Sequence, residues 1–377
     1  MMFHAIDTLC NRTDAFTFSD EVDQLFLEAM RENYAFQWEQ QPFVRWLGER
    51  AGFSPGHLRE YGDIFRIPSL FVGVMKKHGF TSVPEAEIAL TLTSSGTAGE
   101  KTRSFFDRSS LTRIERLARA VFTEAGFVSE TPAHTFIFNY DTGQAGDVGT
   151  AWSAEQKASL APAIVRHRTI CRNEATGAFD FDPARWAAEL LAVPPDQPVR
   201  LIGFPAFIYR SVLELSRLNS AFRVHPDSFV ICGGGWKNHQ GETMTHRAFA
   251  RFLEERIGLP AVNVRDTFGM AEHGIPYAAC REGHHHQPIY GRLAVLDPMT
   301  LLPLPLGREG MLQLLTPYNT AQSNLSVLAT DLAVLATDCP CGLPGRYIAS
   351  IRRGGIRKHK GCAIAAQEIL NRAGARQ

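Results

Sequence analysis

The sequence predicts an α/β fold with largely parallel sheets flanked by helices, followed by a small β-subdomain and a short tail. A length of 377 residues suits one large domain with an appendage. Strand-like and helix-like runs alternate between residues 86 and 290, whereas short strands joined by turns follow residue 291. We therefore predict four regions: a helical region 1–85, an α/β nucleotide- and acyl-binding core 86–290, a β-subdomain 291–350 and a basic tail 351–377.

Two helices are predicted in the N-terminal region. In the first, four apolar side chains fall on one helical face, namely Val22, Leu25, Phe26 and Met30, and Asp20 is the predicted N-cap. The second covers the run PFVRWLGERA and ends at Gly52, because glycine favours the backbone conformation that closes a helix.

The core is predicted to alternate strands with helices. Strand-like runs occur at residues 87–93, 135–140, 199–204, 228–233 and 261–268. Between the first two, the run SSLTRIERLARAVFTEAGF predicts a helix capped by Ser109 or Ser110, with an apolar face that starts at Leu111. This alternation indicates a parallel sheet with helices on both faces.

Composition excludes several classes of protein. The formal net charge is zero and the pI is near 7.2, so the basic excess typical of a nucleic-acid-binding protein is absent. No run of about 18 apolar residues predicts a membrane span. Because the N-terminus also lacks the pattern of a secretory signal, we expect a cytoplasmic protein with mostly reduced cysteines.

The segment TSSGTAGEK follows the first core strand and is a candidate phosphate loop. Its backbone N–H groups and hydroxyls can surround phosphate oxygens, while its glycines permit close approach. The candidate residues are Thr93, Ser94, Ser95, Gly96, Thr97, Gly99 and the cationic Lys101. The spacing differs from both common phosphate-binding glycine motifs, and a polar turn before a helix would explain this loop equally well by itself.

Further candidates follow other strands. In FGMAEHG, Glu272 can hold Mg²⁺ against a triphosphate. Asp331 can accept hydrogen bonds from ribose hydroxyls, and His273 either contacts the substrate or caps a turn. The run GGGWK suits an adenine face or an aromatic acyl group, which adds Gly234, Gly235 and Trp236 to the candidates beside Phe268 and Gly269.

Three motifs in this order, TSSGTAGEK, FGMAE and TD, resemble the adenylate-forming superfamily of acyl-CoA synthetases. Ala98 stands where a hydroxyl residue is usual, and ATD replaces the usual R-T-G-D, so two polar contacts to the nucleotide are lost. After residue 350 only a short basic stretch follows, so we expect no counterpart of that superfamily's large mobile C-terminal domain. This narrows the resemblance to the acyl-protein synthetase (LuxE-like) family, which is also similar in GGGWK, DLAVL, CPCG and RKHKGCA.

This resemblance implies that Cys362, near the C-terminus, accepts the acyl group as a thioester. The surrounding residues agree, because nearby cations and a helix N-terminus lower the pKa of a thiol. Six such side chains precede it within ten positions: Arg352, Arg353, Arg357, Lys358, His359 and Lys360. The alternative is a small buried residue at the start of a terminal helix, preceded by a solvated basic face.

A second group of cysteines suggests structural Zn²⁺. Cys339 and Cys341 form a Cys-x-Cys pair, and together with Cys280 and His286 they supply three thiolates and one imidazole. Which of His284, His285 and His286 binds stays open, although the resemblance to phenylacetate-CoA ligase favours His286. The alternative is reduced loop cysteines beside surface histidines.

The leading hypothesis is an ATP- and Mg²⁺-dependent enzyme that activates a fatty or aryl carboxylic acid as an acyl-adenylate. Glu272 and Lys101 would act on the phosphates, Cys362 would take the acyl group, and a partner enzyme, carrier protein or CoA would accept it. An ATP-independent acyltransferase and a non-catalytic partner subunit are the alternatives. The sequence does not identify the acyl group, the acceptor or the oligomeric state.

Overall fold

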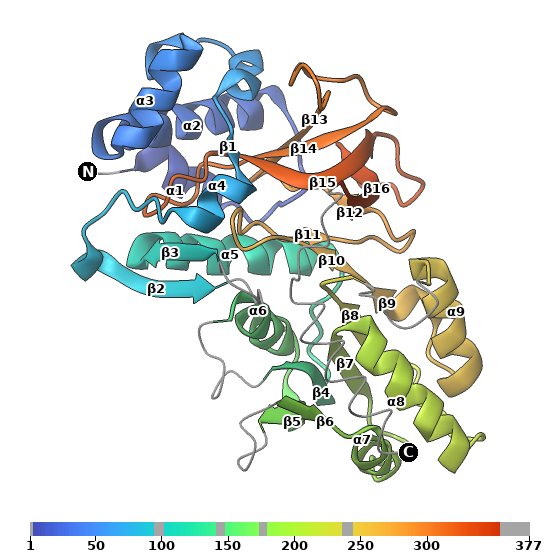
Figure 1. The fold of residues 1–377 in the computed structure, drawn as a ribbon. Coiled ribbons are helices and arrows are strands. Elements are labelled where there is room, and N and C mark those ends of the chain that lie inside the picture. The colour runs from blue at the N-terminus through green and yellow to red at the C-terminus, as the bar shows by residue number, and fades with distance from the viewer. Residues whose placement is uncertain (1–2, 94–101, 141–147, 173–178, 236–243, 355–377) are drawn as a thin grey trace.

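The computed structural model describes residues 3–93, 102–140, 148–172, 179–235 and 244–354. Within these residues the fold is α/β as predicted, with two six-stranded sheets, two smaller antiparallel sheets and helices packed around them (Figure 1). The N-terminal helices lie beside one six-stranded sheet, and helices α7, α8 and α9 lie against the other.

The mainly parallel sheet has the strand order β6-β5-β4-β7-β8-β9. Only the β5–β6 pair is antiparallel. Its strands are β4 (Ala133–Tyr140), β5 (Ala163–Arg172), β6 (Phe179–Phe181), β7 (Val199–Gly203), β8 (Phe229–Cys232) and β9 (Val264–Arg265), and its helices are α6 (Gly149–Ala158), α7 (Pro183–Leu191), α8 (Pro205–Leu218) and α9 (His246–Ile257). The predicted strands near 135–140, 199–204 and 228–233 are therefore confirmed. In the run at 261–268 the first three residues form a 3₁₀ turn, and strand begins only with β9 at Val264.

The predicted strand 87–93 does not belong to this sheet, and this expectation was wrong. It forms β2 (Ile88–Thr93), which pairs antiparallel with β3 (Arg103–Asp107). The apolar residues Phe105 and Phe106 supply the second strand, and a glycine-containing segment between two strands is typical of a hairpin. Thr93 also forms an isolated parallel bridge with Val148, the residue before α6.

The second large sheet is mainly antiparallel, with the order β12-β16-β15-β14-β13, and β1 pairs parallel with β15. Its strands are β1 (Leu70–Phe71), β12 (His285–His286), β13 (Arg292–Leu296), β14 (Glu309–Leu315), β15 (Ser326–Ala336) and β16 (Tyr347–Arg353). The sheet therefore crosses the predicted boundaries at 290 and 350 and recruits a strand from the N-terminal region.

The predicted N-terminal helices are present. They are α1 (His4–Asn11), α2 (Asp20–Gln40), α3 (Pro42–Ala51) and α4 (Val72–Lys77), and α5 (Arg108–Glu124) follows the hairpin. Gly52 closes α3 in the left-handed conformation, with φ of 64°. The caps differ from the prediction: the Ser19 hydroxyl accepts from the backbone of α2, and Asp107 accepts from that of α5. An N-cap precedes the first helical residue, and each predicted cap lay inside the helix.

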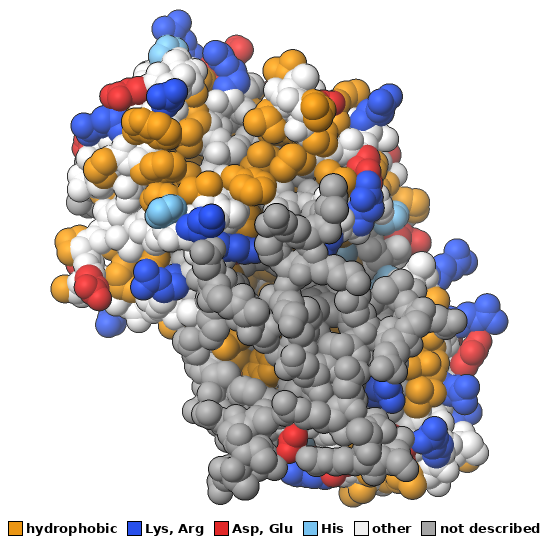
Figure 2. Space-filling model, in the orientation of Figure 1, with side chains coloured by type: hydrophobic (Ala, Val, Ile, Leu, Met, Phe, Trp, Pro, Cys, Tyr) orange, Lys and Arg blue, Asp and Glu red, His pale blue; other side chains and the backbone are white. Residues whose placement is uncertain are grey.

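Short elements complete the described chain: 3₁₀ turns at Pro55–His57, Tyr61–Arg66, Glu85–Glu87 and Ala261–Asn263, and the strand pair β10 (Thr267–Phe268) and β11 (Tyr277–Ala278). None of the helices in the described ranges is long and apolar enough to cross a membrane. Figure 2 shows apolar side chains gathered over the N-terminal helices. Trp46 of α3 and Phe71 of β1 are among the exposed large apolar residues.

Candidate active site and metal centre

Glu272 lies on the turn between β10 and β11, directly against the start of β3. Its side chain is buried, with 5% exposed, and Thr102 Oγ1 donates a hydrogen bond to its Oε1 at 2.7 Å. Ser104 Oγ donates to the carbonyl of Ala271 at 2.8 Å. The hairpin strand is thereby docked onto the Glu272 turn, so the first described residue after the predicted phosphate loop contacts the predicted carboxylate.

Thr93, the first residue of the predicted phosphate loop, also lies near the Glu272 turn. A Cβ atom at Gly149, the first residue of α6, would lie 3.7 Å from the carbonyl oxygen of Thr93 and 3.8 Å from Ala271 Cβ. Thr93, Thr102 and the Glu272 turn therefore gather at the N-terminus of α6. The other predicted loop residues, Ser94, Ser95, Gly96, Thr97, Gly99 and Lys101, lie outside the described residues.

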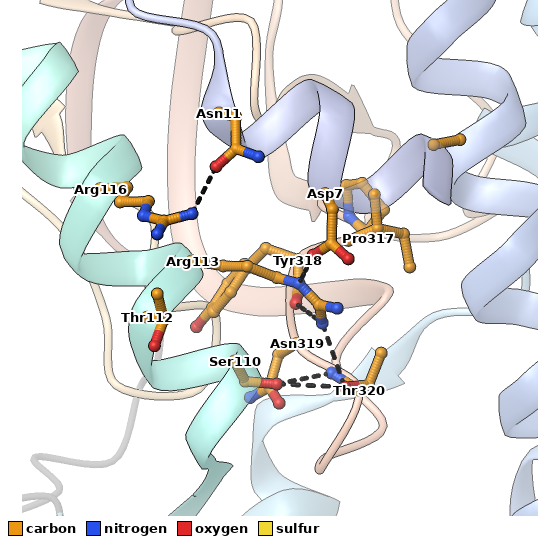
Figure 3. Close-up of polar contacts among 12 residues, drawn as sticks. Asp7, Asn11, Ser110, Thr112, Arg113, Arg116, Pro317, Tyr318, Asn319 and Thr320 are labelled. Carbon is orange, nitrogen blue, oxygen red and sulfur yellow. Dashed lines mark hydrogen bonds and ion pairs between the residues drawn. The ribbon is translucent and has the colours of Figure 1, made fainter. Parts of the chain in front are cut away.

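A buried polar segment at residues 316–324 holds this arrangement together (Figure 3). The guanidinium group of Arg113 on α5 pairs with Asp7 of α1 at 2.7 Å and donates to the carbonyl of Tyr318 at 3.2 Å. Ser110 Oγ accepts from the backbone N–H of Thr320 at 3.0 Å. Side chains of α1 and α5 thus fix the turn at residues 318–320.

The same segment contacts both the hairpin and the Glu272 turn. Asn319 Nδ2 donates to the carbonyl of Phe105 at 3.1 Å, and Asn324 Nδ2 donates to that of His273 at 3.4 Å. Gly274 adopts φ of 89°, and a Cβ atom there would overlap the Tyr318 hydroxyl. Only glycine fits this position, which fixes the path of the chain just after Glu272.

His273 is placed differently from the prediction of a substrate contact or a turn cap. Its side chain is 0% exposed, stacks on Tyr277 and shares a 2.8 Å hydrogen bond with the Tyr277 hydroxyl. Burial lowers the pKa of His273 to about 3, so the imidazole is neutral. A side chain fully enclosed in the core has no surface to offer a substrate, and we leave it out of the site.

Asp331 lies on β15, where it pairs in register with Arg353 of β16. Partial burial raises its pKa, Arg353 opposes this, and the negative charge of Glu272 raises the pKa further. The structure therefore brings Asp331 within electrostatic reach of Glu272, although 59 positions separate them in the sequence. The negative charges of Asp331 and Glu272 therefore act in the same region of the site.

The predicted base- or acyl-binding residues lie at the exit of β8. Gly234 and Gly235 are exposed and adopt φ of 79° and 71°, values that side chains rarely permit. Phe268 on β10 is half-buried and Gly269 is exposed. Trp236 lies outside the described residues. These groups share the carboxyl-end side of the parallel strands, where open α/β sheets bind ligands.

Sequence reasoning missed three polar residues of this region: Thr102, Lys157 and Asp266. Thr102 follows Lys101, and the Lys-Thr pair is the available signal for it. Lys157 on α6 is 9% exposed, and burial lowers its pKa to about 8, against the opposing charge of Asp266. Single charged residues on a helix or before a motif carry no pattern that marks them as buried.

The four predicted metal ligands come together. One ligand atom from each of Cys280, His286, Cys339 and Cys341 lies within 4.8 Å of the others, and the first three residues are buried. The Cys280 and Cys339 sulfurs are 3.8 Å apart, and His286 Nε2 lies 3.3 Å from Cys341 Sγ. Burial raises the pKa of the Cys339 thiol to about 12 in the absence of a cation.

This geometry fits a tetrahedral zinc ion. With Zn–S bonds of about 2.3 Å, two sulfurs of a tetrahedron lie about 3.8 Å apart, whereas a disulfide needs about 2.05 Å. The observed 3.8 Å between the Cys280 and Cys339 sulfurs matches the first value. His284 also approaches, with Nδ1 3.2 Å from Cys339 Sγ, but it is not part of the mutually close group of four.

Comparisons with known proteins place the chain. It is 27% identical to the long-chain-fatty-acid–luciferin-component ligase of Vibrio harveyi over 93% of this chain and 89% of that protein. The ligase of the same name from Aliivibrio fischeri is 24% identical, over 94% of this chain and 95% of its own length. Among solved structures, 2-hydroxyisobutyryl-CoA ligase in complex with 2-HIB-AMP and CoA has a TM-score of 0.70 to this chain at 20% sequence identity. The match covers 91% of this chain and 70% of the ligase, and it supports the assignment of the fold. The family of acyl-protein synthetases, LuxE, matches residues 4–371, and this chain belongs to that family.

Proposed function

We propose that this enzyme activates a carboxylic acid with ATP and passes the acyl group through Cys362 to a partner thiol. The observation that carries the proposal is the docking of Thr102 onto Glu272, which sets a buried carboxylate against the end of the predicted phosphate loop. The curated relatives are named as ligases of a long-chain fatty acid, so a fatty acid is the first substrate to test.

In the first step an oxygen of the substrate carboxylate attacks the α-phosphorus of ATP, and the bond to the β-phosphate breaks. The acyl-adenylate forms and pyrophosphate leaves. Glu272 and Asp331 would hold Mg²⁺ and the ribose hydroxyls, respectively, while residues Thr93 to Lys101 would surround the phosphates. Mg²⁺, when bound, neutralises phosphate charge; the protein positions the two reactants.

In the second step the Cys362 thiolate attacks the acyl carbonyl, and AMP leaves. The thiol proton goes to solvent, and a thioester forms on the enzyme. The basic side chains before Cys362 favour the thiolate at neutral pH. A thiol of a partner enzyme, a carrier protein or CoA then takes the acyl group by a second thioester exchange.

The test is acid-dependent exchange of labelled pyrophosphate into ATP, with a panel of linear fatty acids and benzoates. We expect exchange with at least one acid and, after incubation with ATP, an intact-mass increase of one acyl group. Exchange with none of the acids would refute activation. Labelling by acyl-CoA in the absence of ATP would instead identify an ATP-independent acyltransferase.

We also propose that Cys280, His286, Cys339 and Cys341 bind structural Zn²⁺. The four ligand atoms and the 3.8 Å sulfur separation support a closed tetrahedral site, which leaves no position for a water. The site would join β12 and the turn after β11 to the end of β15. Unbridged thiolates of this kind suit the cytoplasmic location that the sequence predicts.

Cys339→Ser is expected to release the zinc and lower the free energy of unfolding by about 4 kcal/mol or more, because loss of a structural metal is among the most destabilising changes. Zinc content by mass spectrometry and thermal unfolding with and without a chelator measure this. Cys10→Ala is the matched control, since Cys10 is a buried thiol of α1 outside the cluster. Full-length protein without zinc, or a Cys339→Ser variant that keeps it, would exclude the site.

The two nearby histidines are expected to respond differently. His286→Ala should reduce the zinc content, because its Nε2 belongs to the group of four ligand atoms. His284→Ala should keep the zinc, because its Nδ1 contacts only Cys339 among the sulfurs. Zinc content and chelator release rates of both variants decide the assignment, and the opposite ranking would make His284 the ligand.

A further inference from the structure

The ammonium group of Lys157 lies at the exit of β8, at the start of the Gly233–Gly235 segment. A Cβ atom on Gly233 would lie 3.0 Å from Lys157 Nζ and 2.9 Å from Thr267 Oγ1. Because Gly233 has no side chain, the Lys157 ammonium group and the Thr267 hydroxyl can both approach its Cα atom. Thr267 Oγ1 donates to the carbonyl of Cys232 at 2.9 Å, so its proton is already used.

The Lys157 side chain is largely buried and has no direct counter-ion among the described residues. Lys157 is only 9% exposed, and burial lowers its pKa to about 8. No carboxylate among the described residues lies within ion-pair distance of Lys157. Asp266, whose charge opposes the lowering of the lysine pKa, lies 3.3 Å from His285 Nε2 and acts on the lysine from a longer distance. Buried charges in proteins are normally hydrogen-bonded to a partner, so an acceptor is expected in this position.

The lysine lies away from the phosphate end of the site. Helix α6 begins at Gly149, beside Thr93 and Ala271, and Lys157 follows eight positions later (Figure 1). At a rise of about 1.5 Å per residue the two ends are ~12 Å apart along the helix axis. The backbone of Lys157 is therefore well separated, along α6, from the helix N-terminus beside the Glu272 turn.

Resting on the activation reaction proposed above, we infer that Lys157 determines substrate specificity by binding a hydrogen-bond acceptor on the acid, distant from the reacting carboxyl group. The acceptor is a neutral hydroxyl or carbonyl oxygen. A second carboxylate is disfavoured because Asp266 already supplies one negative charge to the same buried region. An acid that leaves this ammonium group without an acceptor is bound less well, because the desolvation of the charge is then not compensated.

The experiment compares pyrophosphate exchange for paired acids of equal skeleton: benzoate with 4-hydroxybenzoate, and linear acids with their terminal hydroxy derivatives. For the wild type, kcat/KM for the hydroxylated acid of the best pair should be about 10- to 100-fold higher than kcat/KM for its unsubstituted partner. This is the effect of one hydrogen bond to a charged group. Lys157→Met should reduce or invert this ratio while it still exchanges the unsubstituted acid. Lys77→Met, at an exposed lysine of α4, is the matched control.

The outcomes separate this inference from the proposed function. If the wild type exchanges no acid, activation itself fails. If it exchanges acids but treats the paired members alike, or if Lys157→Met keeps the wild-type ratio, only the role of Lys157 is overturned. Lys157→Arg provides a second variant that retains the charge; it should keep a preference for the hydroxylated acid even if Lys157→Met folds poorly.

Discussion

Glu272→Gln is expected to reduce acid-dependent pyrophosphate exchange by about 100-fold or more, because the reaction loses the carboxylate that would hold Mg²⁺ against the phosphates. The substitution keeps the shape of the side chain. Its amide oxygen can still accept the hydrogen bond from Thr102 Oγ1, which measures 2.7 Å in the structure. The loss would therefore report the charge and not a collapse of the turn.

The thermal stability of Glu272→Gln, unlike its activity, should not fall. The charge of Glu272 contributes to the raised pKa of Asp331, so its removal lowers that pKa and relieves repulsion between two carboxylates. We expect the melting temperature of Glu272→Gln at pH 7 to equal or exceed that of the wild type. A trade of stability for activity is common where like charges are held together in a site.

The control for this experiment is Glu255→Gln. Glu255 is exposed on α9 and pairs with Arg251 one turn earlier, an interaction that contributes little to stability. The Glu255→Gln variant should keep both its pyrophosphate exchange and its melting temperature near the wild-type values. Exchange by Glu272→Gln within about threefold of the wild type would remove this carboxylate from the proposed mechanism, since removal of one such group normally costs far more.

Much of the core could be predicted because its strands are continuous apolar runs. Strands β4 and β7 are buried along their whole length, as is usual in a parallel sheet covered on both faces. Strand β5 was not predicted because Arg166, His167 and Arg168 interrupt its apolar run, and its first residues, Ala163 to Arg166, are exposed. A strand that is only partly covered has no continuous apolar signal.

The candidate site was predictable where short motifs carry several polar residues, and less so where one residue acts from a distant element. Glu272 was predicted from its motif and Cys339 from its spacing to Cys341. In the structure the charge of Glu272 acts on Asp331, and Cys339 lies in a group of four mutually close ligand atoms. His273 was assigned by adjacency to Glu272, but consecutive residues of a turn face different ways, and this one points into the core. Lys157 required the fold, because its burial depends on the packing of α6 against the parallel sheet, where its neighbours are β4 and β7.

Cys362→Ser is expected to abolish the acyl label on the enzyme while pyrophosphate exchange stays within about twofold of the wild type. The two steps use different groups, and a serine hydroxyl at neutral pH is a far weaker nucleophile than a thiolate. The label is measured by intact mass after incubation with ATP and acid, and its release by neutral hydroxylamine identifies a thioester. Cys362 lies outside the described residues, so this chemical test replaces a geometric one.

The structure provides the matched control for that label. Burial raises the pKa of the Cys10 thiol to about 12, and the residue is only 1% exposed, so it stays protonated and inaccessible. Cys10→Ala should therefore retain full labelling. This control distinguishes the removal of any one thiol from the removal of the thiol that accepts the acyl group. A hydroxylamine-sensitive label that persists in Cys362→Ser would move the acceptor to another cysteine. A variant that loses exchange together with the label would instead show that Cys362 contributes to adenylation, because a thiol used only in the second step has no effect on the first.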